Sequence, residues 1–245
     1  MRGVGTQQLE RALIHRFPGA RIARMDLDTT SGKWSHQRIL GAVGRHEVDL
    51  LIGTQMIAKG LDFPGVTLVG VVDADTALHL PDFRSAERTF QLLAQVAGRA
   101  GRGPQGGRVI VQTRQPDHHA IRRAAAHDVE GFLAEETALR SSPPYPPATA
   151  LLNLVVSGGE ERLVGREAAR VAEWCRGLVE RYELPLTVLG PAPCSIARVQ
   201  ERWRWHVLLK GPSASIGRLV RYAAGKLTVA AKAKLVLDRD PVTLL

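Results

Sequence analysis

Long apolar runs are missing from this 245-residue sequence: none reaches the roughly 18 residues that a transmembrane helix needs. The first residues, Met1 to Thr6, also lack the apolar stretch of a signal peptide. We therefore expect a soluble, cytoplasmic protein with no membrane partner.

Cysteine is almost absent as well. Cys175 and Cys194 are the only two, which is too few for a disulfide framework, and they do not form a Cys-x-x-Cys pair. The sequence predicts two reduced, partly buried thiols. It predicts no metal site built within this chain, zinc included.

Charge is unevenly distributed. The net charge is +9, and residues 146–245 hold 15 basic against 9 acidic side chains, whereas residues 1–145 hold 18 against 15. A basic domain often contacts nucleic acid or an acidic partner, although a basic but inert surface is the alternative. The C-terminal part is therefore the better candidate for such contacts.

The first part of the chain alternates buried apolar strands with amphipathic helices. The expected strands are 21–25, 49–53, 66–72 and 108–113, and the expected helices are 5–16, 34–43 and 83–100. Continuous apolar strands that alternate with helices predict an α/β fold with a parallel sheet.

Residues 115–141 are rich in alanine and charge and are expected to be helical. The segment 141–147 that follows has four prolines in five positions, which excludes a helix or central strand and predicts a stiff polyproline linker. We expect a first domain over 1–116, a helical connector and proline-rich linker over 117–147, and a second domain over 148–245.

The second domain shows a different order of elements. Strands are expected at 150–157, 187–189, 203–210 and 235–238, and helices at 160–182 and 213–227, with a turn at 190–193. The order βαββαβ predicts a smaller α+β domain of the ferredoxin-like kind.

Two segments of the first domain carry chemistry. Gln95 to Arg102 places Arg99 and Arg102 three residues apart on one face of a helix end, beside glycines that let a ligand approach. Guanidinium groups bind polyphosphate oxygens bidentately and stay charged. The alternative is an ordinary basic helix end.

The second segment, Gly53 to Asp62, follows a buried strand. Ligand sites in open α/β sheets lie at the carboxyl ends of the strands, so Thr54 and the loop after it are placed where a ligand would bind. The alternative is that Asp62 only caps the turn at 63–65.

Together the two segments resemble motifs V and VI of superfamily 2 helicases. The matching residues are Thr54, Gly60 and Asp62 for motif V, and Gln95, Arg99 and Arg102 for motif VI. Further segments resemble the PriA family of primosomal replication-restart helicases (primosomal protein N′): 66–75, 80–84, 87–91, 145–147, 189–193, 204–205 and 238–241. The resemblance covers essentially the whole chain and is to the C-terminal half of the family, the second RecA-like helicase lobe plus the C-terminal domain.

This resemblance implies roles for the matching residues. Arg99 and Arg102 would act as arginine fingers at the γ-phosphate of ATP, and Gln95 would couple phosphate state to lobe closure. Asp62, in the loop with Gly60, would bind the nucleotide ribose. Thr54 would contact a DNA phosphate. One departure is Leu61, where histidine is expected in many relatives.

Two motifs of such a motor are missing from this sequence. No Gly-x-x-x-x-Gly-Lys-Ser/Thr loop is present, and no Asp is followed by Glu. ATP and Mg²⁺ would therefore be shared with a first lobe, and we expect this chain alone not to hydrolyse ATP. It would be a fragment of a longer product or a natural form that has lost its first lobe.

In the second domain, the segment 198–206 interleaves basic and aromatic residues. On a strand, Arg202, Arg204 and His206 share one face, and Trp203 and Trp205 share the other. The tryptophans could stack on unpaired bases or pack in the core, and either arrangement leaves Arg202 and Arg204 available for phosphate.

The resemblance therefore implies a part of an ATP-dependent 3′→5′ DNA helicase that recognises stalled forks and restarts replication by primosome assembly. The resemblance implies three kinds of partner: branched and single-stranded DNA, the single-stranded-DNA-binding protein through its acidic tail, and other primosome proteins. The alternative is a non-catalytic DNA-binding or primosome scaffold protein.

Overall fold

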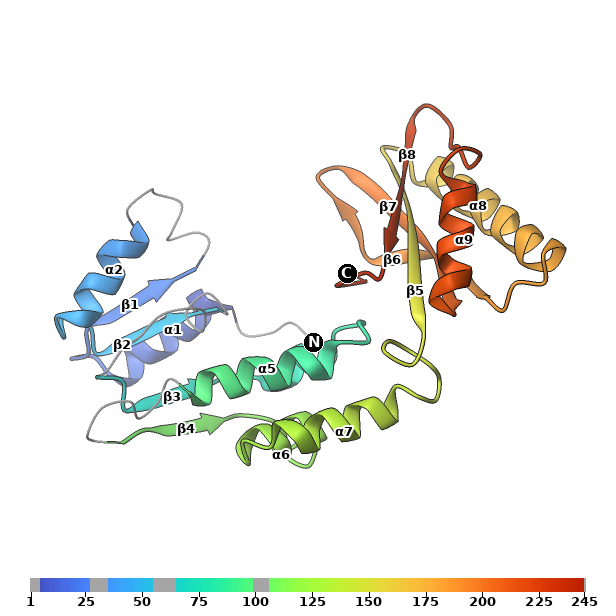
Figure 1. Cartoon of the computed structure of the whole chain (residues 1–245). Coiled ribbons are helices and arrows are strands. Elements are labelled where there is room, and N and C mark those ends of the chain that lie inside the picture. Colours follow the sequence, from blue (N-terminus) through green and yellow to red (C-terminus); the bar gives the residue numbers. More distant parts are fainter. Residues whose placement is uncertain (1–4, 27–34, 55–64, 99–105, 245) are drawn as a thin grey trace. The chain divides into compact units, whose positions relative to one another are not determined.

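The computed structural model describes residues 5–26, 35–54, 65–98 and 106–244 (Figure 1). The chain forms two compact units. The first holds Met1–Leu80 and Ser85–Phe132, and the second holds Pro81–Arg84 and Leu133–Leu245. The boundary at residues 132 and 133 falls inside the connector expected at 117–147. The assignment of Pro81–Arg84 to the second unit was not expected.

In the first unit, the described strands are short and pair in parallel. Strand β1 (Ile22–Met25) pairs with β2 (Leu50–Gly53), and β3 (Leu68–Val71) pairs with β4 (Arg108–Val111). Helices α1 (Thr6–Arg16) and α2 (Ser35–Gly44) accompany the first pair. The predicted α/β class is confirmed. Among the described residues, the strands form two separate pairs.

Helices complete the first unit around the second strand pair. They are α4 (Ala74–Leu78), α5 (Ser85–Ala97), α6 (His119–Ala125) and α7 (Val129–Leu139), and α7 continues into the second unit. The core here brings together apolar side chains of α5, α6 and α7, and the rings of Phe90 and Phe132 stack 4.1 Å apart. Helix α4 was not predicted, because five residues are too few to show a helical period.

The predicted start of α5 at residue 83 is wrong by two residues. Phe83 packs in the second unit against Tyr145, with ring centroids 5.6 Å apart. The backbone N–H of Arg84 donates to Asp82 Oδ1 at 2.9 Å, and the helix begins at Ser85. Phe83 is apolar because it is buried in the second unit, so it is not the first residue of the helix.

The second unit has the predicted βαββαβ order and a four-stranded antiparallel sheet. Its elements are β5 (Ala150–Gly158), α8 (Glu161–Arg181), β6 (Thr187–Val199), β7 (Arg202–Gly211), α9 (Ser213–Ala223) and β8 (Ala233–Arg239). The strand order β6-β7-β5-β8 places the first strand beside the third and the last, as in ferredoxin-like folds. The predicted α+β class of this unit is confirmed.

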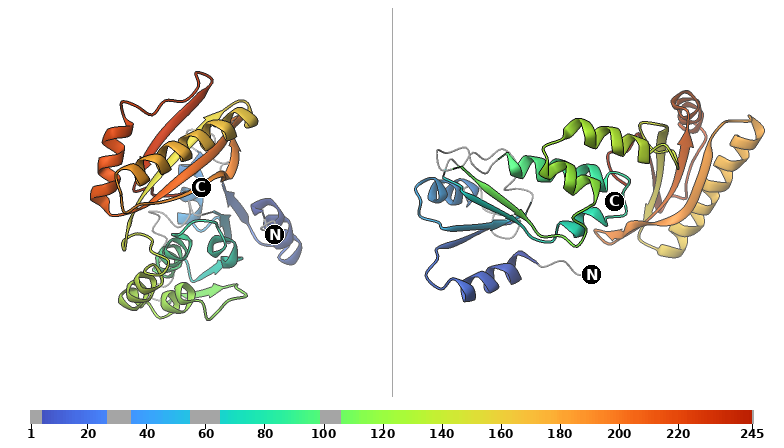
Figure 2. Two further views of the ribbon diagram at one scale, coloured as in Figure 1. Left: turned by 90° about the vertical axis from the view of Figure 1, so that its right-hand side faces the viewer. Right: turned by 90° about the horizontal axis from the view of Figure 1, so that it is seen from below.

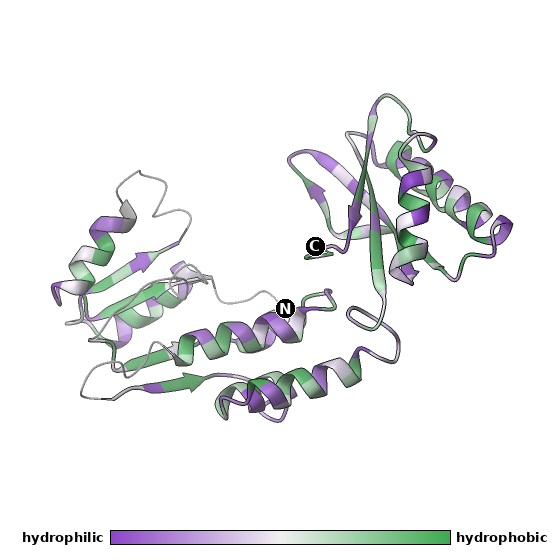
Figure 3. Ribbon diagram, in the orientation of Figure 1, coloured by the Kyte–Doolittle hydropathy of each residue, from purple (hydrophilic) through white to green (hydrophobic). Residues whose placement is uncertain are grey.

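Both helices of this unit cover one face of the sheet, which we call the helix face (Figures 1 and 2). Strand β5 is hydrophobic along nearly its whole length (Figure 3). Its alternate residues Leu152, Leu154 and Val156 are fully buried against the helices. The core of the unit therefore lies between the sheet and α8 and α9. The opposite side is called the helix-free face.

Two local predictions in this unit are wrong. The turn expected at 190–193 is an irregularity inside one long strand, β6, whose pairing with β7 shifts register between Leu189 and Ala192. Gly190 has φ 92°, a value that L side chains rarely adopt, and it allows the bulge without ending the strand.

The proline-rich segment at 141–147 is not an extended polyproline linker. It forms consecutive turns, in which the Tyr145 N–H donates to the Arg140 carbonyl at 2.8 Å. The Tyr145 ring lies against Phe83, and the Lys210 ammonium lies 4.0 Å from its centroid. The contacts of one aromatic side chain hold this segment against its own unit.

Candidate nucleotide and nucleic-acid sites

The motif V segment begins at the carboxyl end of β2. Thr54 follows Gly53 directly and is exposed. Parallel pairing with β1 places Gly53 beside Met25, so Thr54 lies at the edge where both strands end. This is the position in which open α/β sheets bind ligands. Gly60 and Asp62 lie outside the described residues.

The motif VI segment continues from α5. Gln95 lies in the last turn of this helix and is half-buried, whereas Arg99 and Arg102 lie outside the described residues. Phe90, Leu93 and Val96 bury one face of α5 in the core, which fixes the helix from which Gln95 projects. The structure thus describes one residue from each of the two motifs, Thr54 and Gln95.

A polar network that the sequence analysis did not single out lies at the carboxyl ends of β3 and β4. Asp75 accepts hydrogen bonds from the Thr113 hydroxyl at 2.6 Å and the Arg114 N–H at 2.8 Å. These bonds hold the pKa of the Asp75 carboxyl below its ordinary value. The signal for this network was available, since Asp75 comes soon after one predicted strand and Thr113 ends another.

Asp73 makes the turn from β3 into α4. Its backbone is left-handed, with φ 55°, and its carboxylate accepts from the Thr76 hydroxyl at 2.7 Å. It therefore caps the N-terminus of α4, the role in which aspartate stabilises helices. Asp73 and Asp75 have structural partners that fix the loop.

Metal-ligating side chains do not cluster in the described part of the chain. Within these ranges, no three His, Cys, Asp or Glu side chains are grouped so that they could hold a metal ion. Asp73 and Asp75, which follow β3, accept hydrogen bonds from Thr76 and Thr113. Asp26, which directly follows β1, accepts one from the Thr6 hydroxyl at 2.7 Å.

Both cysteines of the second unit are buried and reduced. Burial raises the pKa of the Cys175 thiol to about 12. At neutral pH this thiol therefore stays protonated and packs as a small apolar group.

In the second unit, β7 separates its aromatic and basic side chains as expected from a strand. Trp203 and Trp205 pack against the core on the helix face, and a Cβ placed on Gly165 of α8 would lie 3.5 Å from Trp205. Arg202 and Arg204 are on the helix-free face. Of the two arrangements that the sequence left open, base stacking or packing in the core, the two tryptophans therefore adopt packing in the core.

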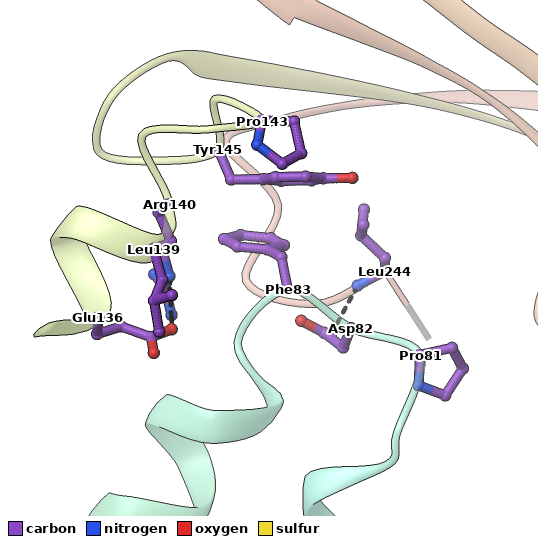
Figure 4. Close-up of a pocket in the computed structure, with 9 residues that line it drawn as sticks. All are labelled: Pro81, Asp82, Phe83, Glu136, Leu139, Arg140, Pro143, Tyr145 and Leu244. Atoms are coloured by element: carbon purple, nitrogen blue, oxygen red, sulfur yellow. Dashed lines mark hydrogen bonds and ion pairs between the residues drawn. The ribbon is translucent and has the colours of Figure 1, made fainter. Parts of the chain in front are cut away.

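One end of the helix-free face is covered by segments distant in sequence. Leu151 and Leu208 of the sheet form an apolar cluster with Leu244, Phe83 and Tyr145. Figure 4 shows this region, where a pocket of about 410 Å³ lies within the second unit. We call Phe83, Tyr145 and Leu244, which lie over Leu151 and Leu208, the aromatic cover.

Asp82 holds the aromatic cover together. It is 7% exposed, and its Oδ2 accepts from the Thr243 hydroxyl at 2.8 Å and from the Leu244 N–H at 3.0 Å. In the sequence, Asp82 stands out only as part of the segment 80–84 that resembles the family. A contact between residues more than 160 positions apart has no local signal in the sequence.

Within the described residues, no helix is both long and apolar enough to pass through a lipid bilayer.

Comparison with known proteins agrees with this architecture. Residues 5–104 match the family model of the helicase conserved C-terminal domain, and residues 142–242 match that of the primosomal protein N C-terminal domain. The two matches follow each other along the chain as the two folds do. The class is therefore a helicase lobe joined to a ferredoxin-like C-terminal domain.

Individual relatives narrow this class to one family. The chain is 47% identical over 208 residues to the replication restart protein PriA of Bacillus subtilis, with 85% of this chain and 26% of the relative covered. It is 41% identical over 247 residues to that of Treponema pallidum, with 99% and 36% covered. The chain belongs to the PriA family of replication restart proteins and corresponds to its C-terminal part. It spans only between about a quarter and a third of the length of these relatives.

Proposed function

We propose that this chain supplies the second motor lobe and the C-terminal domain of an ATP-dependent 3′→5′ DNA helicase that restarts replication at stalled forks by primosome assembly. The observation that carries the proposal is the order of the two family matches, a helicase lobe over 5–104 and a primosomal domain over 142–242. Relatives named as replication restart proteins align with 99% of the chain, which supports the same function.

The lobe would contribute one wall of the ATP site. Arg99 and Arg102 stabilise charge on the γ-phosphate, Gln95 senses its presence, and Asp62 with Gly60 holds the ribose. ATP and Mg²⁺ need a second wall with a phosphate-binding loop, which this sequence does not contain. Support from the described residues is the fixed position of α5, from which the motif VI segment continues.

DNA would be contacted at two places. Thr54, exposed at the carboxyl end of β2, is available to bind a backbone phosphate. Arg202 and Arg204 would hold phosphates on the second unit. Branched and single-stranded DNA, the acidic tail of the single-stranded-DNA-binding protein and other primosome proteins are the proposed partners.

A chimera tests the motor function. In it, this chain replaces the matched region of the Bacillus subtilis relative, so that a first lobe is present. We expect DNA-stimulated ATP hydrolysis from the chimera. Arg102→Ala should lower turnover by about 10³-fold or more, because an arginine finger contributes at least that much to phosphoryl transfer.

Two controls make the result specific. Arg108→Ala, an exposed arginine at the start of β4, should leave turnover of the chimera unchanged. The isolated chain should hydrolyse no ATP with or without DNA. A chimera whose turnover survives Arg102→Ala, or an isolated chain that turns over ATP, would contradict the proposed division of the site.

A further inference from the structure

The helix-free face of the second unit has a covered end and an open end. At the covered end, Leu151 and Asn153 of β5 are buried, Leu151 beneath the aromatic cover. At the open end of the same strand, Val155 and Ser157 are only half-buried, although β5 is a central strand. The side chains of β5 on this face therefore become more exposed from Asn153 to Val155, which is where the aromatic cover ends.

Basic side chains occupy the open end. The antiparallel register sets Arg204 of β7 and Lys234 of β8 on either side of Ser157, so the three residues form one row across the sheet. Arg202 lies two residues further along β7 on the same face, and its guanidinium donates to the Ser157 carbonyl at 3.1 Å. We call Arg202, Arg204 and Lys234 the basic band.

The spacing of the basic band suits a charged backbone. Strands lie roughly 4.8 Å apart, so Arg204 and Lys234 stand about 10 Å apart, and Arg202 is about 7 Å from Arg204 along the strand. Asp238, on the same face, lies level with Asn153, two rows from Ser157. Glu201, in the turn before Arg202, is exposed and forms an ion pair with Arg198. Positive charge therefore dominates the open end.

Among the described residues, no aromatic ring lies at the open end where it could stack on a base. Trp203 and Trp205, the aromatic residues of β7, are on the helix face and pack in the core. His206 lies on the helix-free face between Ala192 and Val155, but burial lowers its pKa, so it carries no charge at neutral pH. Proteins that prefer single strands stack unpaired bases on aromatic rings. In the described ranges, the open end thus presents basic side chains suited to phosphate and no such rings.

We infer that the basic band binds the phosphate backbone of duplex DNA and does so without reading unpaired bases. A duplex is the better ligand because it carries one charge per about 1.7 Å of axis, twice the density of a single strand. The inference rests on the proposed DNA binding of the second unit. It names the face, the residues and the form of DNA.

The test compares two double variants of the full chain. Arg204→Gln with Lys234→Gln removes two charges from the basic band. Arg162→Gln with Arg166→Gln removes two charges from exposed positions of α8 on the opposite side of the sheet. Fluorescence anisotropy measures binding to a duplex of about 20 base pairs, and to a single strand of equal length, from about 50 to 200 mM salt.

The expected result separates the two variants. The band variant should bind the duplex roughly tenfold or more weakly at about 50 mM salt, and its salt slope should fall by about 2. The α8 variant should match the unmodified chain. Lys234→Glu, a single change at an exposed position of an edge strand, should also weaken duplex binding. Thermal melts followed by circular dichroism establish that each variant is folded.

Three results would overturn the inference. One is a folded band variant that binds the duplex like the unmodified chain. Another is an unmodified chain that prefers the single strand at equal salt. The third is a band variant that keeps its duplex affinity and loses affinity for an acidic peptide. An unmodified chain that binds neither form of DNA would overturn the proposed function itself, which distinguishes the two failures.

Discussion

At the residue scale, the position of His206 in β7 lowers the pKa of its imidazole. Its cross-strand neighbours Val155 and Ala192 are uncharged, and Arg204 lies on the same face. Burial first, and the Arg204 charge second, lower the pKa of His206 from its ordinary 6.5. The folded chain therefore keeps this imidazole neutral at a pH where the unfolded chain protonates it.

This depressed pKa predicts a pH dependence of stability. Well above pH 6.5 His206 is neutral in both states and contributes no dependence. As the pH falls below 6.5, the unfolded state binds the proton first, so the free energy of unfolding decreases. Urea titrations between pH 7 and pH 5 should show a smaller decrease for His206→Gln than for the unmodified chain. An equal decrease in both would refute the assignment.

At the scale of elements, β7 serves two surfaces through its alternation. Its odd-numbered residues Trp203 and Trp205 bury aromatic area against the helices, whereas the even-numbered Arg202 and Arg204 lie on the helix-free face. A one-residue shift in pairing would exchange the two sets, so the register that buries the rings also orients the arginines.

The two sets should therefore respond separately to substitution. Trp205→Ala should destabilise the second unit by about 3 kcal/mol, because a large ring leaves the core. DNA affinity measured well below the melting temperature should stay within about twofold of the unmodified chain, a difference under ~0.5 kcal/mol. Tryptophan fluorescence should also not be quenched by added DNA. Loss of affinity without loss of stability would assign Trp205 to the DNA surface instead.

At the scale of the whole molecule, chain order and packing order differ. Pro81–Arg84 follow a helix of the first unit and precede α5, yet they belong to the second unit. Asp82 accepts hydrogen bonds there from Thr243 and Leu244, at the other end of the chain. The second unit therefore needs a segment that a division by sequence assigns to the first.

This arrangement predicts that Asp82→Ala weakens the second unit. The substitution leaves the buried Leu244 N–H and the Thr243 hydroxyl without their acceptor, at a cost of about 2 to 3 kcal/mol. Thr243→Val removes one of these bonds and should cost about 1 kcal/mol. Tryptophan fluorescence during urea unfolding measures both, since Trp174, Trp203 and Trp205 lie in this unit. An unchanged midpoint for Asp82→Ala would contradict the role of Asp82.

Much of the fold followed from local patterns in the sequence. The strands at 49–53 and 108–113 come from continuous apolar runs, and the long helix at 160–182 comes from a period of 3.6 residues. Short segments carry such patterns by themselves, and the βαββαβ order follows from them. The alternation in β7 predicted that Arg202 and Arg204 share a face. The candidate residues of the first domain came from the resemblance to motifs V and VI, and of these six only Thr54 and Gln95 fall in the described ranges.

Tertiary structure decided which distant segments meet. Neither the packing of Phe83 with Tyr145 nor the bond from Thr243 to Asp82 has a local pattern, because both join segments brought together only when the sheet forms. The row of Arg204, Ser157 and Lys234 depends on the pairing register of three strands, which no single strand specifies. The sequence by itself determined the elements, the motifs and the excess of basic residues. Long-range packing alone decided that this charge gathers at one open end of a sheet, since the aromatic cover occupies the other.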